Sequence, residues 1–153
     1  MTDVKVEIRG LDELERKLGT ISEHLRKKTA LNAVTAGAAK VEEYTKRNIF
    51  DTFSEKQTGS LANSVTVTAT VTQNGAEASI APMRVYARIQ EFGGTVHAKP
   101  GGFLHFKIGD AWVRTKQVTI PARPYLGPAV NDNQEQIISA MREEVELGIA
   151  QSV

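Results

Sequence analysis

The sequence predicts an α+β domain: an antiparallel β-sheet flanked by a long N-terminal helix and a C-terminal helix, with an inserted β-hairpin arm. Three observations predict this class. Apolar residues recur at helical spacing before residue 50 and after residue 126, Thr alternates with small apolar residues over 64–72, and a Gly-rich stretch occupies 93–122. The length of 153 residues is that of one domain, so we expect 1–153 to form a single domain with 93–122 as its arm.

The first 50 residues predict a strand and two helices. Residues 4–8 alternate apolar and charged side chains, which is typical of a half-buried strand. Leucines and an isoleucine at steps of three and four indicate a first helix over 11–25, and Gly19-Thr20 indicates a break in it. A second helix is expected from about 22 to 49. Small residues over 30–39 predict that it packs closely against a sheet or a second chain; the alternative is that they only raise helix propensity.

Strand signals follow a loop that we expect over 50–63. Residues 64–72 alternate Thr with small apolar side chains, and Gln73-Asn74-Gly75 is a hairpin turn signal. Residues 77–81 then predict the partner strand. Residues 86–92 predict either a further strand or a short helical segment, which the following glycines end.

The arm over 93–122 is expected to be a β-hairpin. Two alternating stretches, 103–108 and 112–120, flank a tight turn at Gly109-Asp110. About 30 residues of such material between core elements are often functional.

The C-terminal segment predicts one acidic helix from Leu126 to about Ala150, with Pro128 in its first turn. Residues 126–153 hold one base and five acids, whereas 1–50 hold ten bases and eight acids and 51–125 hold eight bases and five acids. The net charge of +1 therefore conceals an acidic end and a basic middle. This asymmetry suits head-to-tail self-association; the alternative is that both charged faces are merely solvated.

The sequence contains no pattern of catalytic or metal-binding residues. Absence of cysteine excludes a disulfide scaffold, a thiolate metal site and a thiol nucleophile. His24, His97 and His105 have no neighbouring carboxylate pattern that would complete a zinc site, and no nucleophile elbow, phosphate loop or dinucleotide fingerprint occurs. We therefore expect no catalytic residue, no cofactor and no metal, and a protein that is not an enzyme.

Neither a signal peptide nor a membrane-spanning run is visible, since the N-terminus lacks an apolar core segment and no run of about 18 apolar residues occurs. We expect a chain made in a cytoplasm, with no membrane partner.

Aromatic and basic residues interleave in the arm. They predict either nucleic-acid contact or a wedge between protein subunits, and the low net charge favours protein contact. The predicted contact residues are Phe103, Phe106, Trp112, Arg114, Lys116, Arg123, Tyr125, Glu143 and Glu144.

Four segments, taken in order, resemble a known family. They are Gly10–Leu14 opening a helix, Thr58–Val65 opening a strand, Tyr86–Gly93, and Ala122–Ala129 before the last helix. Together they resemble the HK97 gp10-like family of tailed-phage neck and tail-completion proteins. The matching positions are Thr58, Gly59, Leu61, Ser64, Tyr86, Glu91, Phe92, Gly93 and Pro124.

The resemblance implies a structural virion protein with a fold similar to that of tail terminators. It implies a ring, hexameric by preference, that joins the head connector or adaptor to the tail tube, with genomic DNA passing non-specifically through its lumen. The protein would lie in the neck or tail of the virion and, during assembly, in the host cytoplasm. Two alternatives are a tail terminator that caps the tube and a non-enzymatic DNA-binding accessory protein that uses the basic aromatic arm.

Side-chain roles follow for these segments. We expect Tyr86 and Phe92 to anchor at the sheet, and Arg123 to pair with an acid. Pro124, Tyr125 and Leu126 belong either to the core or to an interface, with the core favoured.

Overall fold

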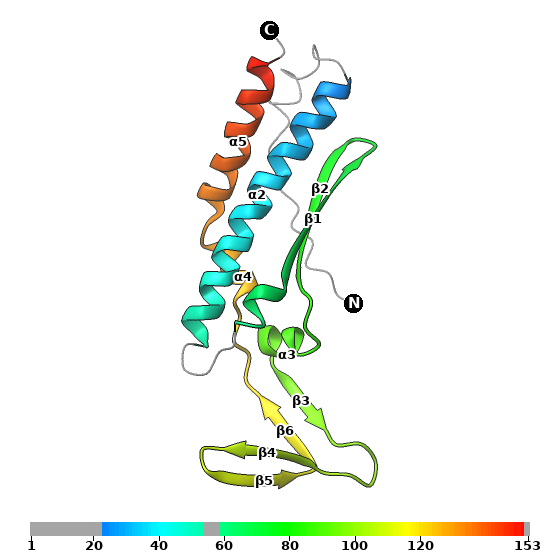
Figure 1. Cartoon of the computed structure of the whole chain (residues 1–153), viewed down its shortest axis with the longest axis vertical. Coiled ribbons are helices and arrows are strands. Elements are labelled where there is room, and N and C mark those ends of the chain that lie inside the picture. The colour runs from blue at the N-terminus through cyan, green and yellow to red at the C-terminus, as the bar shows by residue number, and fades with distance from the viewer. Residues whose placement is uncertain (1–22, 54–58, 152–153) are drawn as a thin grey trace. The chain divides into compact units, whose positions relative to one another are not determined.

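The computed structural model describes residues 23–53 and 59–151 (Figure 1). The chain is mixed α+β, as expected, and its contacts group it into two compact units: Met1–Met83 with Tyr125–Val153, and Arg84–Pro124. The strand predicted at 4–8, most of the helix predicted at 11–25, and Thr58 lie outside the described residues. The single-domain organisation stays a prediction.

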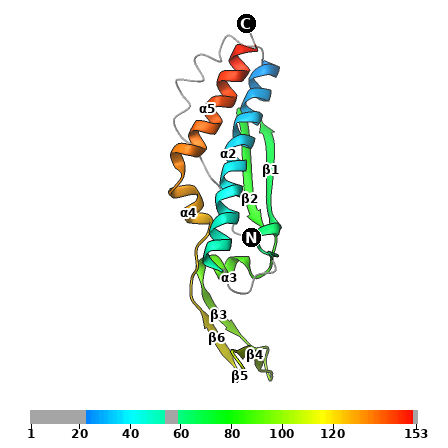
Figure 2. The same cartoon turned by 60° about the vertical axis from the view of Figure 1, so that its left-hand side comes forward.

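The first unit is built around helix α2 (Glu23–Thr52), which has helix α5 (Gln134–Ala150) on one side and the hairpin of β1 (Val65–Thr72) and β2 (Gly75–Pro82) on the other (Figures 1 and 2). Surface pairs between side chains four apart support α2, among them Lys46 with Glu42 at 2.6 Å. Lys27 lowers the pKa of the Glu23 carboxyl by a hydrogen bond and by its charge. The helix continues through Thr52, so the loop predicted from residue 50 begins too early.

Helices α2 and α5 approach closely because small residues lie at their contact. A Cβ atom on Gly37 would lie 2.7 Å from Met141 Cγ, and one on Gly148 would lie 2.9 Å from Thr29 Cβ. The small-residue stretch therefore does allow a close approach at Gly37, but the partner there is α5, not the sheet or second chain that was predicted. Helix α2 as a whole also contacts β1 and β2.

The β1–β2 hairpin has its turn where the sequence predicted it. Thr72 lies opposite Gly75 across the turn, and Val65 lies opposite Pro82 at the far end. Val65 and Ile80 are buried, whereas the alternating threonines face outward in most cases. A short 3-10 helix, η1 (Ala62–Ser64), leads into β1.

The C-terminal segment is two helices rather than the single helix predicted. Helix α4 (Leu126–Asn131) contains Pro128 in its first turn, and α5 starts at Gln134. The residues 131–133 are Asn, Asp and Asn, whose side chains compete for backbone hydrogen bonds and favour helix ends. Asn133 Nδ2 donates to Ala129 O at 3.1 Å across this break.

The second unit contains helix α3 (Ala87–Phe92) and two antiparallel ladders: β3 (Gly94–His97) with β6 (Gln117–Ile120), and β4 (Leu104–Ile108) with β5 (Ala111–Thr115). The ambiguous segment 86–92 is thus helical. Antiparallel pairing is confirmed, but among the described residues it is spread over three two-stranded ladders rather than one sheet.

The arm is more complex than the single hairpin predicted. The stretch expected as one strand over 112–120 breaks at Lys116, where Thr115 Oγ1 donates to Gln117 O at 2.8 Å and accepts from Gln117 N at 3.3 Å. This local turn lets β5 and β6 join different ladders, so that β4–β5 runs across the end of β3–β6 (Figure 1).

Candidate functional site

The base of the arm is held by close backbone contacts at Gly93. This residue has φ +69° and ψ −173°, a region essentially restricted to glycine. A Cβ there would lie 2.7 Å from Ala122 N and 2.9 Å from Ile120 O. Arg123 N donates to Gln90 O at 2.7 Å beside it. The start of β3 and the segment after β6 are therefore fixed together at the end of α3.

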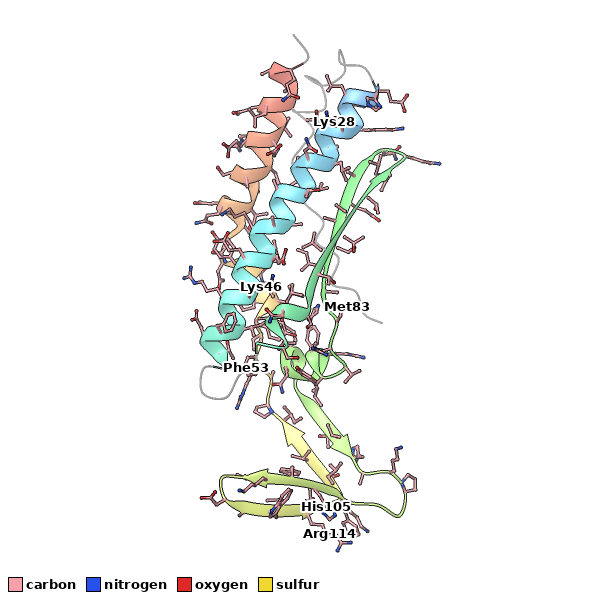
Figure 3. The ribbon with its side chains drawn as sticks, viewed as in Figure 1. Lys28, Lys46, Phe53, Met83, His105 and Arg114 are labelled. Atoms are coloured by element: carbon pink, nitrogen blue, oxygen red, sulfur yellow. The ribbon has the colours of Figure 1, made fainter. Side chains whose placement is uncertain are left out.

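The β4–β5 hairpin that the arm carries has two chemically different faces. Residues directly opposite in an antiparallel pair share a face, and faces alternate along each strand. The register pairs His105 with Arg114 and Lys107 with Trp112, which places these four on one face, here called the basic face. Figure 3 labels His105 and Arg114 on this hairpin. The opposite, apolar face consists of Leu104, Phe106, Ile108, Ala111, Val113 and Thr115.

The basic face is exposed and ordered by an aromatic contact. Arg114 Cζ lies 3.8 Å from the centre of the Phe103 ring, and Lys116 Nζ lies 6.0 Å from it. Trp112 is 76% exposed. Lys107 Nζ lies 3.6 Å from a carboxylate oxygen of Asp110, a fully exposed residue in the turn. This loose pair in water offsets little of the positive charge.

The apolar face is only partly covered. Leu104, Phe106 and Val113 are half-buried, and Ile108 is 62% exposed. An isolated two-stranded hairpin is at best marginally stable in water. The apolar face therefore leaves part of its hydrophobic surface in contact with water.

The remaining predicted contact residues do not join this hairpin. Arg123 is exposed near the base of the arm, and on α5 Glu143 is exposed while Glu144 is half-buried. Tyr125 is only 1% exposed, with Phe53 packed edge-on at 6.4 Å between ring centres and Asn48 Nδ2 donating to its carbonyl at 3.0 Å. Its inclusion among the surface contacts is corrected, because the ring is enclosed by its own unit; the favoured core placement is confirmed.

The other residues of that segment divide between core and surface. Leu126 is buried, as expected, but Pro124 is exposed. Pro124 precedes the first buried residue of the segment, so the core begins at Tyr125.

Of the residues that carry the family resemblance, those near β1 have clear structural roles. Gly59 has φ +65°, Leu61 is buried, and Ser64 Oγ donates to Leu61 O at 2.7 Å. These contacts start η1 and direct the chain into β1.

The resembling residues on α3 depart from expectation in part. Glu91 is buried, but Tyr86 and Phe92 are 40% and 60% exposed. Their predicted role as anchors at the sheet is wrong, because this six-residue helix buries the face that carries Ala87 and Glu91 instead.

The sequence also missed two features of the site. Strand β3 has no clear alternation of its own, and His105 was not grouped with the basic residues. The turn at Gly109-Asp110 was a usable signal, because a two-residue turn fixes Ile108 opposite Ala111 and so sets every later pair.

Within residues 23–53 and 59–151, no group of three or more His, Cys, Asp or Glu side chains is placed to hold a metal ion. His97 and His105 lie on different ladders. In the same part of the chain, no helix has the length and hydropathy needed to cross a membrane.

A family model described as the phage virion morphogenesis family matches residues 12–146. The chain belongs to the phage virion morphogenesis family. Searches of curated proteins and of solved structures give no match. The family match covers the whole of residues 84–124, so the arm is part of the segment that defines this virion morphogenesis protein. The predicted class, a bacteriophage virion assembly protein, is confirmed.

Proposed function

We propose that this virion morphogenesis protein is a structural component of the phage head–tail junction. In this proposal it forms a closed ring, hexameric by preference, that joins the head connector to the tail tube and surrounds the path of the DNA. It acts by docking rather than by catalysis. Family membership and the four segments that resemble the HK97 gp10-like family support the proposal.

The observation that carries the proposal is the apolar face of the β4–β5 hairpin. Phe106, Val113 and Ile108 form a continuous apolar strip on a ladder to which the described residues contribute two strands. A neighbouring subunit that covers this strip would supply the contacts that the hairpin lacks.

A ring is the assembly that suits such a contact. An arm that docks on a different surface of the next copy makes a heterologous interface, which gives a closed ring when the rotation closes and a filament when it does not. The acidic C-terminal helix supports the same arrangement, since Glu135, Glu143 and Glu146 are exposed on α5. Repulsion between these like charges disfavours contact between two copies of α5.

The same ring assembly would suit a tail terminator that caps the tube, which is the alternative within this class. The adaptor and tube proteins are then the partners on the two faces of the ring. A DNA-binding accessory protein would instead act without a ring, and assembly state separates the two classes.

Native mass spectrometry of the full chain and of two charge-insertion variants tests the proposal. Ile108→Glu places a carboxylate on the apolar face, and Val71→Glu places one at an exposed apolar residue near the β1–β2 turn as the control. We expect rings from the wild type and from Val71→Glu, and a monomer from Ile108→Glu. A wild type that stays monomeric, or an Ile108→Glu variant that forms normal rings, contradicts the proposal.

A further inference from the structure

Positive charge is concentrated in the second unit. Residues 84–124 contain seven Lys and Arg residues but only two acids, Glu91 and Asp110. Glu91 is buried, so Asp110 is the acid that this unit exposes. The charge of the chain as a whole, +1, gives no sign of this concentration.

The register of β4–β5 gathers part of this charge on one face. Lys107 and Arg114 share the basic face with His105 and the exposed indole of Trp112. Neighbouring positions on one face of a ladder lie about 5 to 7 Å apart, along the strand or across it. Like charges at this spacing repel, and among the described residues the ion pair of Lys107 is the loose one with Asp110. Such a face gains most from a partner that carries closely spaced negative charge.

The side chains of this face are also partly preorganised. Arg114 lies over the Phe103 ring, which fixes the position of its charge, and Lys116 stands beside the same ring. Ordering a long cationic side chain before binding reduces the entropy that it loses on binding. A chance collection of solvated surface cations has no such support.

The two faces of the hairpin call for different partners. The apolar face, with Phe106 and Val113, has the chemistry of a protein contact, whereas the basic face offers cations and one exposed aromatic ring. The basic and apolar residues that interleave in the sequence therefore lie on separate faces of the hairpin. One hairpin serves two contacts at once.

We infer that the basic face of the β4–β5 hairpin binds the phosphate backbone of double-stranded DNA. Duplex DNA carries one negative charge per about 1.7 Å of its axis, and its major groove admits a two-stranded β-ribbon. Contacts to phosphates carry no sequence information, so binding is non-specific. This inference rests on the proposed function for its setting, a ring around the DNA path, and it assigns the surface that meets the DNA.

The main competitor for this face is the acidic helix α5 of a second copy. Its exposed carboxylates are accompanied by the exposed Arg142, which lowers the density of negative charge. The phosphate backbone has no such cations of its own, so DNA is the better complement. Contact with α5 is retained as an outcome of the test.

The test measures DNA binding and assembly on the same full-length samples. Fluorescence anisotropy follows a labelled duplex of mixed sequence over a range of salt concentrations, with a single strand of the same sequence alongside. Native mass spectrometry reports the assembly state. The test variant is Lys107→Gln with Arg114→Gln. The control is Lys28→Gln with Arg47→Gln, which removes the same charge from exposed positions on α2. Figure 3 labels Lys28.

The wild type is expected to bind the duplex with an affinity that falls steeply with salt. The hairpin variant should bind the duplex at least about tenfold more weakly at low salt. The slope of the logarithm of the binding constant against the logarithm of the salt concentration should be less steep by roughly 2 per bound copy. The control should bind nearly as the wild type does, and both variants should keep the wild-type assembly.

Four results would overturn the inference. They are a wild type that does not bind the duplex, equal losses in the two double variants, tighter binding of the single strand than of the duplex, and loss of the assembly in the hairpin variant alone. The last would assign the basic face to α5 of a neighbouring copy. A monomeric wild type that binds duplex through the hairpin would contradict the proposed ring and leave this inference standing.

Discussion

Replacement of Gly148 by Ala tests the close approach of α2 and α5. The added methyl group would lie 2.9 Å from Thr29 Cβ and closer still to both Thr29 γ atoms. Thr29 is buried, and its Cβ is fixed to the backbone of α2. The two helices must therefore move apart to accept the new group, because no flexible side chain is present to yield.

Two opposing contributions decide the size of the effect. Ala is favoured over Gly within a helix by about 1 kcal/mol. Overpacking of a well-packed contact costs roughly 1–3 kcal/mol, and the rigidity of Thr29 Cβ places this case at the upper end. We expect a net loss of about 1–2 kcal/mol in the free energy of unfolding.

Gly37→Ala is the matched control at the same helix contact. Its new Cβ would meet Met141 Cγ at 2.7 Å and Met141 Sδ at 2.8 Å, which belong to a flexible side chain able to repack. The gain in helix propensity should offset most of the cost, so we expect a change within about 0.5 kcal/mol.

Urea unfolding followed by circular dichroism measures both variants. We expect a lower midpoint for Gly148→Ala with an unchanged slope, which reports lost stability rather than an altered unfolded state. The reasoning is refuted if Gly148→Ala is as stable as the wild type, or if Gly37→Ala loses as much as Gly148→Ala.

Three further predictions concern the arm and the core. Gly93→Ala should destabilise the base of the arm by more than about 2 kcal/mol, through backbone strain and collision with Ala122 N. Gly101→Ala has a similar φ but open space around the new Cβ, so it should lose less stability. Hydrogen exchange across 84–124 measures both losses, and equal losses would contradict the collision. Tyr125→Ala should lower the free energy of unfolding by about 3–5 kcal/mol, and Trp112→Ala should lower it by less than about 0.5 kcal/mol. Thermal unfolding of each variant measures these losses, and similar losses would contradict the core placement of Tyr125. Deletion of 95–120 should leave heads and tails unjoined in a complementation assay, and normal particles would exclude the arm as the docking element.

The elements that the sequence predicted well are those determined by neighbouring residues. The β1–β2 hairpin follows from the Thr alternation and from a turn at 73–75, so both strands and their register were predictable. Helix α2 follows in the same way from its apolar spacing. Its end was missed by three residues because Phe50, Asp51 and Thr52 are compatible with both helix and loop.

The parts that were missed depend on contacts between distant residues. Strand β3 exists because it pairs with β6, whose residues come 20 or more positions later in the chain, and no local sequence pattern indicates that pairing. The exposed positions of Tyr86 and Phe92 follow from which face of α3 is covered, and six residues are too few for periodicity to decide this. The break between α4 and α5 had a signal in three successive Asn and Asp residues, and the prediction gave it too little weight.

The candidate site was predicted by composition but not by geometry. Phe106, Trp112 and Arg114 were correctly assigned to strands of the arm, yet the sequence interpretation treated them as one mixed surface. The register separates Phe106 from the other two, because successive side chains along a strand lie on opposite faces of the ladder.

The most direct test of the central claim is the position of the protein in the virion. Electron microscopy of virions that carry a gold-labelled affinity tag on this chain would locate it. We predict label at the junction between head and tail, with a ring of density there that is absent from particles lacking the protein. Label along the tail tube or at the distal tip, or virions with no label, would contradict the account.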